Sequence, residues 1–163
     1  MADFYRKSKL IRRSRVFWGS FSLWRPRLIF WCGALATGVI SVGFAKLADL
    51  AQHGFHGLTT ATEWSFLLPL LLTPAGFALS ACLAIRFFPN SQGSGIPQAI
   101  AARHLKEDED RGKLLSLRIA FGKILLTALG LFCGASIGRE GSTVQVGASI
   151  MLAVARFGGM AQA

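Results

Sequence analysis

Three long apolar runs constrain the fold of this chain more than any other feature of its sequence. They cover about residues 28–50, 64–88 and 115–135. Each run is long enough to cross the hydrocarbon core of a bilayer, which needs about 20 helical residues. Since a spanning segment must satisfy its own backbone polar groups, we expect three membrane helices and an all-α fold. A soluble anion- or nucleotide-binding enzyme would have to bury all three runs in its core, so we expect no enzyme.

The basic residues are concentrated before the first apolar run, although the whole chain carries a formal net charge of +10. No nucleic-acid-binding motif accompanies this charge, so we expect it to orient the protein in a membrane rather than bind nucleic acid. Residues 51–63 contain no Lys or Arg, whereas residues 86–113 contain many. The positive-inside rule therefore places the N-terminus and the loop around Lys106 in the cytoplasm. We expect a multi-pass integral protein, of a bacterial inner membrane.

The polar segments are expected to lie outside the bilayer. In residues 1–27, Phe4, Ile11 and Trp18 recur at heptad spacing among basic residues. This pattern predicts an amphipathic helix on the cytoplasmic membrane surface, with a disordered basic tail as the alternative. Residues 51–63 and 104–113 are predicted to be solvated loops.

The cysteines and histidines indicate neither a disulfide framework nor a metal site. Cys32, Cys82 and Cys133 lie in separate apolar runs, where we expect them to act as small packing residues. The histidines fall in polar connections, away from the cysteines. No metal and no cofactor is predicted.

A first glycine-rich motif, Gly93-Ser94-Gly95-Ile96-Pro97, follows the second apolar run. Its glycines open a sharp turn, and proline suits the first turn of a helix, which we place at about residues 96–105. This helix is too short to span the membrane. Its free N–H groups, its dipole and the Ser94 hydroxyl would converge on an anion. The alternative is a plain turn with a helix cap.

A second motif, Gly138-Arg139-Glu140-Gly141-Ser142, precedes a helix expected at about residues 142–156. Paired broken helices let transporters bind anions without placing full charges in lipid. Glu140 lies in a run that is otherwise uncharged except for Arg139, which makes it a functional candidate. At a helix start its carboxylate would compete with an anion, and protonation would release it, so we expect a gate or proton carrier. A structural Arg139–Glu140 ion pair is the alternative.

Small residues recur along two of the apolar runs. In the third run and just after it, Gly122, Gly130, Gly134 and Gly138 fall on a four-residue ladder that only Leu126 interrupts, which predicts close helix packing. Gly33, Thr37 and Ser41 do the same in the first run. This pattern supports an alternative function, a truncated or structural helix-packing membrane module that transports nothing by itself.

The segments GSGIPQ and GREGSTVQVG, in this order and with Lys123 between them, closely resemble the CLC family of chloride channels and chloride/proton antiporters. The resemblance implies the N-terminal portion of an inverted-repeat helical membrane fold, found in a homodimer with one pore per subunit. It implies chloride transport, as a voltage-gated-type channel or as an antiporter that also moves protons. Since the family's remaining pore elements lie beyond Ala163, we expect an incomplete transmembrane domain over residues 28–163.

The resemblance also implies roles for individual residues. Ser94 becomes the side-chain ligand of a central chloride, supported by the turn of Gly95, Ile96 and Pro97. Glu140 becomes the gating glutamate, and backbone amides of Arg139, Glu140 and Gly141 line an outer site. Lys123 adds positive potential near the pathway, with a lysine that snorkels to the interface as the alternative.

Two residues depart from the family's usual pattern. Ser142 stands where proline usually follows GREG, and with Gln145 it has the spacing of a capping box. We expect its hydroxyl to satisfy an N–H group that would otherwise face the pore. Gln98 replaces a glutamate that often follows GSGIP.

Overall fold

The computed structural model describes residues 21–61 and 65–159, and all their regular structure is helical, as predicted. The predicted amphipathic helix of the N-terminal arm lies largely outside the described residues. The helices are α2 (Phe21–Thr60), the short 3-10 helix η1 (Ser65–Leu67), α3 (Leu68–Phe87), α4 (Ile96–His104), α5 (Asp108–Leu114), α6 (Leu117–Phe132) and α7 (Glu140–Phe157).

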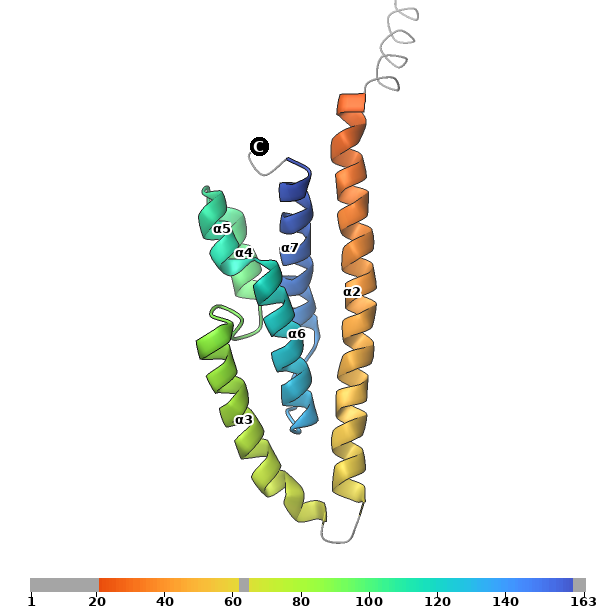
Figure 1. The fold of residues 1–163 in the computed structure, drawn as a ribbon, viewed down its shortest axis with the longest axis vertical. Helices are drawn as coiled ribbons and strands as arrows, with labels where there is room; N and C mark the ends of the chain where they lie inside the picture. The colour runs from red at the N-terminus through yellow and green to blue at the C-terminus, as the bar shows by residue number, and fades with distance from the viewer. Residues whose placement is uncertain (1–20, 62–64, 160–163) are drawn as a thin grey trace, which may run out of the picture.

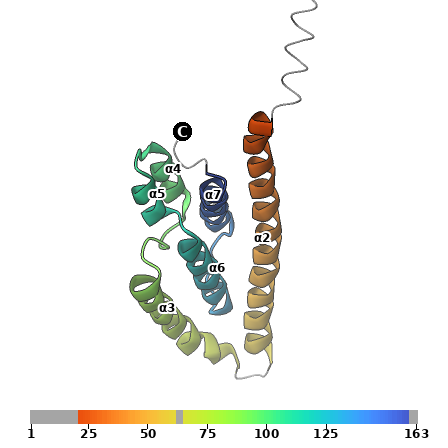
Figure 2. The same ribbon diagram turned by 45° about the horizontal axis from the view of Figure 1, so that its top comes forward.

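Three segments are long and apolar enough to cross a membrane. They are Trp24–Thr60 of α2, Leu68–Phe87, which is α3, and Asp108–Phe132, which contains both α5 and α6. Their number agrees with the three apolar runs, and the chain is a membrane protein. Helix α2 runs the length of the molecule, with α6 and α7 beside it. Helix α3 starts near the far end of α2 and rises away from it, on the other side of α6 (Figure 1). The start of α2, the α4–α5 pair and the end of α7 lie at one end of the bundle (Figure 2).

The predictions of loops at residues 51–63 and 104–113 are wrong, because both segments are largely helical. Helix α2 continues through most of residues 51–63, because its polar side chains lie exposed on the helix and do not interrupt it. The Thr59 and Thr60 hydroxyls donate to the His56 carbonyl near its end, at 3.0 and 2.8 Å.

Residues 104–113 include most of α5, whose first turn is acidic and whose last turn is basic. That order complements the helix dipole and stabilises a short helix.

The other helix starts follow local sequence signals. Helix α3 begins at Leu68 rather than at residue 64, with proline in its first turn, and Pro74 lies inside the curved helix seen in Figure 1. At the start of α6, the Ser116 hydroxyl accepts a hydrogen bond from the Ile119 amide at 3.2 Å. Gly134, with φ of 86°, follows the end of α6.

Small residues bring the helices together, including Gly33 of the predicted pattern, where a Cβ atom would lie 2.6 Å from the Met151 sulfur of α7. A Cβ atom on Gly76 of α3 would lie 2.6 Å from the Cβ of Cys133. Gly147 of α7 faces the Thr37 methyl group of α2 at 3.0 Å by the same measure, whereas Gly138 has open space around it. Cys133 is thus a buried packing residue, but Cys32 and Cys82 are exposed.

Candidate functional site

The GSGIP motif forms a tight turn that ends in the start of α4. Gly93 and Gly95 have φ of 74° and 91°, a backbone region that residues with a Cβ rarely adopt. The first hydrogen bond of α4 runs from the Ala99 amide to the Gly95 carbonyl at 3.1 Å, so the preceding amides lack a partner within the helix. The Ser94 hydroxyl is exposed and accepts a long bond from the Ile96 amide at 3.3 Å.

The GREGS motif forms the start of α7, two residues earlier than predicted. Its first hydrogen bond runs from the Thr143 amide to the Arg139 carbonyl at 3.0 Å. The amides of Glu140, Gly141 and Ser142 therefore precede the first backbone bond of the helix. These N–H groups carry the positive end of the α7 dipole.

The two helix starts contact each other through their glycines. A Cβ atom on Gly95 would lie 2.8 Å from the Gly141 carbonyl oxygen and 2.8 Å from the Gln145 Cβ. A Cβ atom on Gly141 would lie 3.0 Å from the Ser94 hydroxyl oxygen and would overlap the Ser94 carbonyl. Any side chain at either position would separate the two motifs.

Lys123 of α6 holds the GSGIP turn in place through hydrogen bonds to backbone carbonyls. Its side chain is only 4% exposed, and its ammonium group donates to the Ser91 carbonyl at 2.9 Å and to the Gly93 carbonyl. The interpretation of Lys123 as a snorkelling lysine is therefore wrong. None of the ion pairs found among the described residues includes Lys123, so its positive charge has no carboxylate partner there.

Arg139 turns away from its neighbour Glu140. Its guanidinium donates to the Asp49 carboxylate at 2.6 Å and to the Ala45 carbonyl at 3.1 Å, both on α2. The alternative of an Arg139–Glu140 pair is therefore wrong. Since this ion pair is partly exposed, its main consequence is to tie the start of α7 to α2.

Glu140 is the first residue of α7 and is exposed in this chain. Within the described part of the chain, its carboxylate makes no hydrogen bond or ion pair. A carboxylate at a helix N-terminus benefits from the dipole without any direct partner.

A cleft of about 580 Å³ opens where the two helix starts meet, and we call it the α4–α7 cleft. Five of the predicted site residues line it, namely Ser94, Ile96, Lys123, Glu140 and Gly141. The others do not: Gly95 is buried in the contact between the motifs, Pro97 lies in the first turn of α4, and Arg139 points toward α2.

The capping box predicted for Ser142 and Gln145 is absent. The helix begins before Ser142, whose hydroxyl instead lies 3.1 Å from the Thr127 hydroxyl of α6. The Gln145 amide donates to the carbonyls of Asn90 and Leu114, at 3.1 and 3.3 Å. Gln98 donates to the Gln92 carbonyl at 2.8 Å.

Sequence reasoning missed Thr127, which lines the cleft together with Ser142. It lies four residues after Lys123 on α6, so the two side chains share one helix face. This i, i+4 spacing could have predicted from the sequence that Thr127 lies near Lys123.

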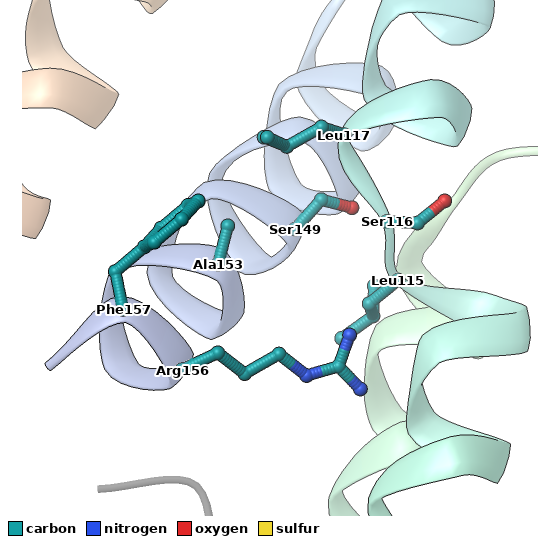
Figure 3. A pocket seen from close by; sticks show the side chains of 7 residues that line it. All are labelled: Leu115, Ser116, Leu117, Ser149, Ala153, Arg156 and Phe157. Atoms are coloured by element: carbon teal, nitrogen blue, oxygen red, sulfur yellow. The ribbon is translucent and has the colours of Figure 1, made fainter. Parts of the chain in front are cut away.

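A second pocket, of about 510 Å³, lies between the start of α6 and the end of α7 (Figure 3). No predicted site residue lines it. Its cation, Arg156, is already bound to Asp108 through the carboxylate at 2.9 Å and the carbonyl at 2.6 Å. No group of three or more potential metal-ligating side chains occurs in residues 21–61 and 65–159.

The fold and the cleft define a helical membrane protein with two broken-helix starts at one site. Residues 75–163, which contain both motifs, match the family model described as "Voltage gated chloride channel". The chain belongs to this family, the CLC family.

Curated relatives from Salmonella arizonae, Salmonella newport and Salmonella dublin are similar to this chain. Each is named H(+)/Cl(-) exchange transporter ClcA and is 32% identical over 122 residues. The match covers 70% of this chain but 24% of each relative, so the chain spans about a quarter of their length. No solved structure gives a significant match.

The contact between the motifs predicts different outcomes for the two glycines of GREGS. Gly141→Ala would push the Ser94 turn away and lower the melting temperature in detergent, at a cost of about 1–3 kcal/mol. Gly138→Ala meets open space and serves as the matched control, with a change within about 0.5 kcal/mol. Equal melting temperatures for the two variants would contradict the contact.

The buried Lys123 predicts a loosened turn when its ammonium group is removed. Lys123→Met leaves the Ser91 carbonyl without its charged donor. Hydrogen exchange of the Ser91 and Ala99 amides, which are hydrogen-bonded at the two ends of the turn, should therefore rise roughly tenfold. Lys113→Met, at an exposed lysine of α5, is the control and should leave these amides unchanged. If both variants exchange at the wild-type rate, Lys123 does not hold the turn.

Proposed function

We propose that this chain takes part in chloride transport across a membrane, within a voltage-gated-type channel or a chloride/proton antiporter of the CLC family. The observation that carries the proposal is the convergence of two helix N-termini and the Lys123 ammonium on one cleft. The similarity to relatives named H(+)/Cl(-) exchange transporter ClcA supports it. Since the chain spans about a quarter of these relatives' length, the proposal concerns the part of the transport pathway that its own residues form.

The α4–α7 cleft supplies positive potential without placing a mobile cation beside the anion. The N–H groups at the starts of α4 and α7 bear partial positive charge, and Lys123 adds a full charge behind the turn. In this proposal, the Ser94 hydroxyl and the amides near Ile96 bind the central chloride, and those of Glu140 and Gly141 bind an outer one. Such fixed dipoles favour an anion while leaving it free to depart.

Glu140 is proposed as the gate. Its carboxylate stands at the start of α7, where a permeant chloride would also be most stable, so the two compete for one position. Protonation removes the negative charge and the attraction to the helix end. The protonated side chain then moves out of the site, and chloride binds there. In an antiporter, the proton that Glu140 carries would cross the membrane in exchange for chloride.

The proposed orientation places the N-terminus in the cytoplasm of a bacterium, with the protein in the inner membrane as part of a homodimer. The ends of the bundle differ in charge, which supports the orientation. The end that holds the start of α2, the α4–α5 pair and the end of α7 (Figure 2) carries Arg25, Arg27, Arg103, Lys106, Arg111, Lys113 and Arg156. Such an excess of Lys and Arg marks the cytoplasmic side.

Glu140→Gln tests the gate in purified protein reconstituted into liposomes. The amide cannot ionise, so we expect chloride efflux to lose its dependence on pH and any proton movement coupled to it to disappear. Chloride-selective and pH electrodes measure both fluxes at once. Glu109→Gln makes the same change on the exposed face of α5 and should behave like the wild type.

Two outcomes contradict this proposal in different ways. Unaltered pH dependence and proton movement in Glu140→Gln would remove the gate from Glu140. No chloride efflux above that of empty liposomes, even for the wild type, would favour the alternative of a helix-packing module without transport.

A further inference from the structure

Two buried hydroxyl groups meet in the α4–α7 cleft. Thr127 of α6 is 5% exposed, Ser142 of α7 is 6% exposed, and their oxygen atoms are 3.1 Å apart. Both side chains line the cleft, together with Lys123 and Glu140. The pair therefore lies where the proposed anion pathway passes.

The pair has one more donor than it can use. Each hydroxyl carries one proton, and the bond between them uses a single one. In the described residues, neither hydroxyl has a second hydrogen bond, so one O–H group lacks an acceptor. A buried donor without an acceptor costs folding free energy. We therefore expect this O–H group to donate to a hydrogen-bond acceptor that enters the cleft.

The Ser142 backbone adds a second free donor. Its amide precedes the first hydrogen bond of α7, which the Thr143 amide donates. Proline, the residue usual at this position in the family, has neither an amide proton nor a hydroxyl. Serine here thus adds two donors to the helix start.

We propose that Thr127 and Ser142 form an additional anion subsite that favours small anions of high charge density over large, diffuse ones. This inference rests on the proposed transport function and names the anion class that the site prefers. Hydroxyl and amide donors interact most strongly with concentrated negative charge, so chloride gains more than iodide. The competing explanation is a purely structural hydrogen bond between α6 and α7.

Relative permeability to chloride and iodide separates these explanations. In liposomes carrying the purified protein, Ser142→Ala and Thr127→Val should each lower the chloride-to-iodide efflux ratio about fivefold, the effect of one lost hydrogen bond. Thr127→Ser keeps the hydroxyl and should restore the ratio. Ser142→Pro, which also removes the amide proton, should lower the ratio at least as far.

Ser149→Ala is the matched control. Ser149 is a fully buried serine on the same helix whose hydroxyl donates to the Gln145 carbonyl at 2.9 Å. It lines the pocket of Figure 3 instead of the α4–α7 cleft, so its loss should leave the efflux ratio unchanged.

The outcomes distinguish this inference from the transport function itself. Wild-type efflux with the same ratio in Ser142→Ala and Thr127→Val would overturn the subsite and leave the transport proposal intact. A lower melting temperature with an unchanged ratio would assign the pair a structural role and also overturn it. No anion efflux from wild-type protein would overturn both proposals.

Discussion

The contact between Gly95 and Gly141 is the constraint on which the rest of the site depends. Each glycine leaves room for the backbone of the other motif, and a side chain at either one would overlap it. Because the backbones touch, the free N–H groups of α4 and α7 face one cleft. Two helix ends that would each attract an anion weakly thus act on the same volume.

GREGS contains two ionisable side chains, those of Arg139 and Glu140. Among the described residues, only Arg139 has a hydrogen-bond or ion-pair partner for its side chain. Arg139 is held by Asp49 on α2, and Lys123 is fixed by the carbonyls of Ser91 and Gly93. Both cations are therefore held by hydrogen bonds, whereas the Glu140 carboxylate is exposed and makes none among the described residues. This division suits a site in which the positive potential is permanent and the negative group moves.

The sequence predicts what local rules determine. Glycine and Pro97 set the start of α4 through their own backbone preferences, and three apolar runs require three spans. Contacts between segments that are far apart in the chain could not be predicted from the sequence. The Arg139 bond to Ala45 joins residues 94 positions apart, and the Ser142–Thr127 bond depends on how α6 packs against α7. The polar end of α2 was misassigned because polarity resembles a loop when the exposed helix face is unknown.

The location of bound anions tests the central claim most directly. In crystals of the protein grown in bromide, anomalous difference density should appear in the α4–α7 cleft, within hydrogen-bonding distance of the Ser94 hydroxyl or the Glu140 and Gly141 amides. Bromide found only beside exposed lysine and arginine side chains, with the cleft free of anomalous density, would contradict the account.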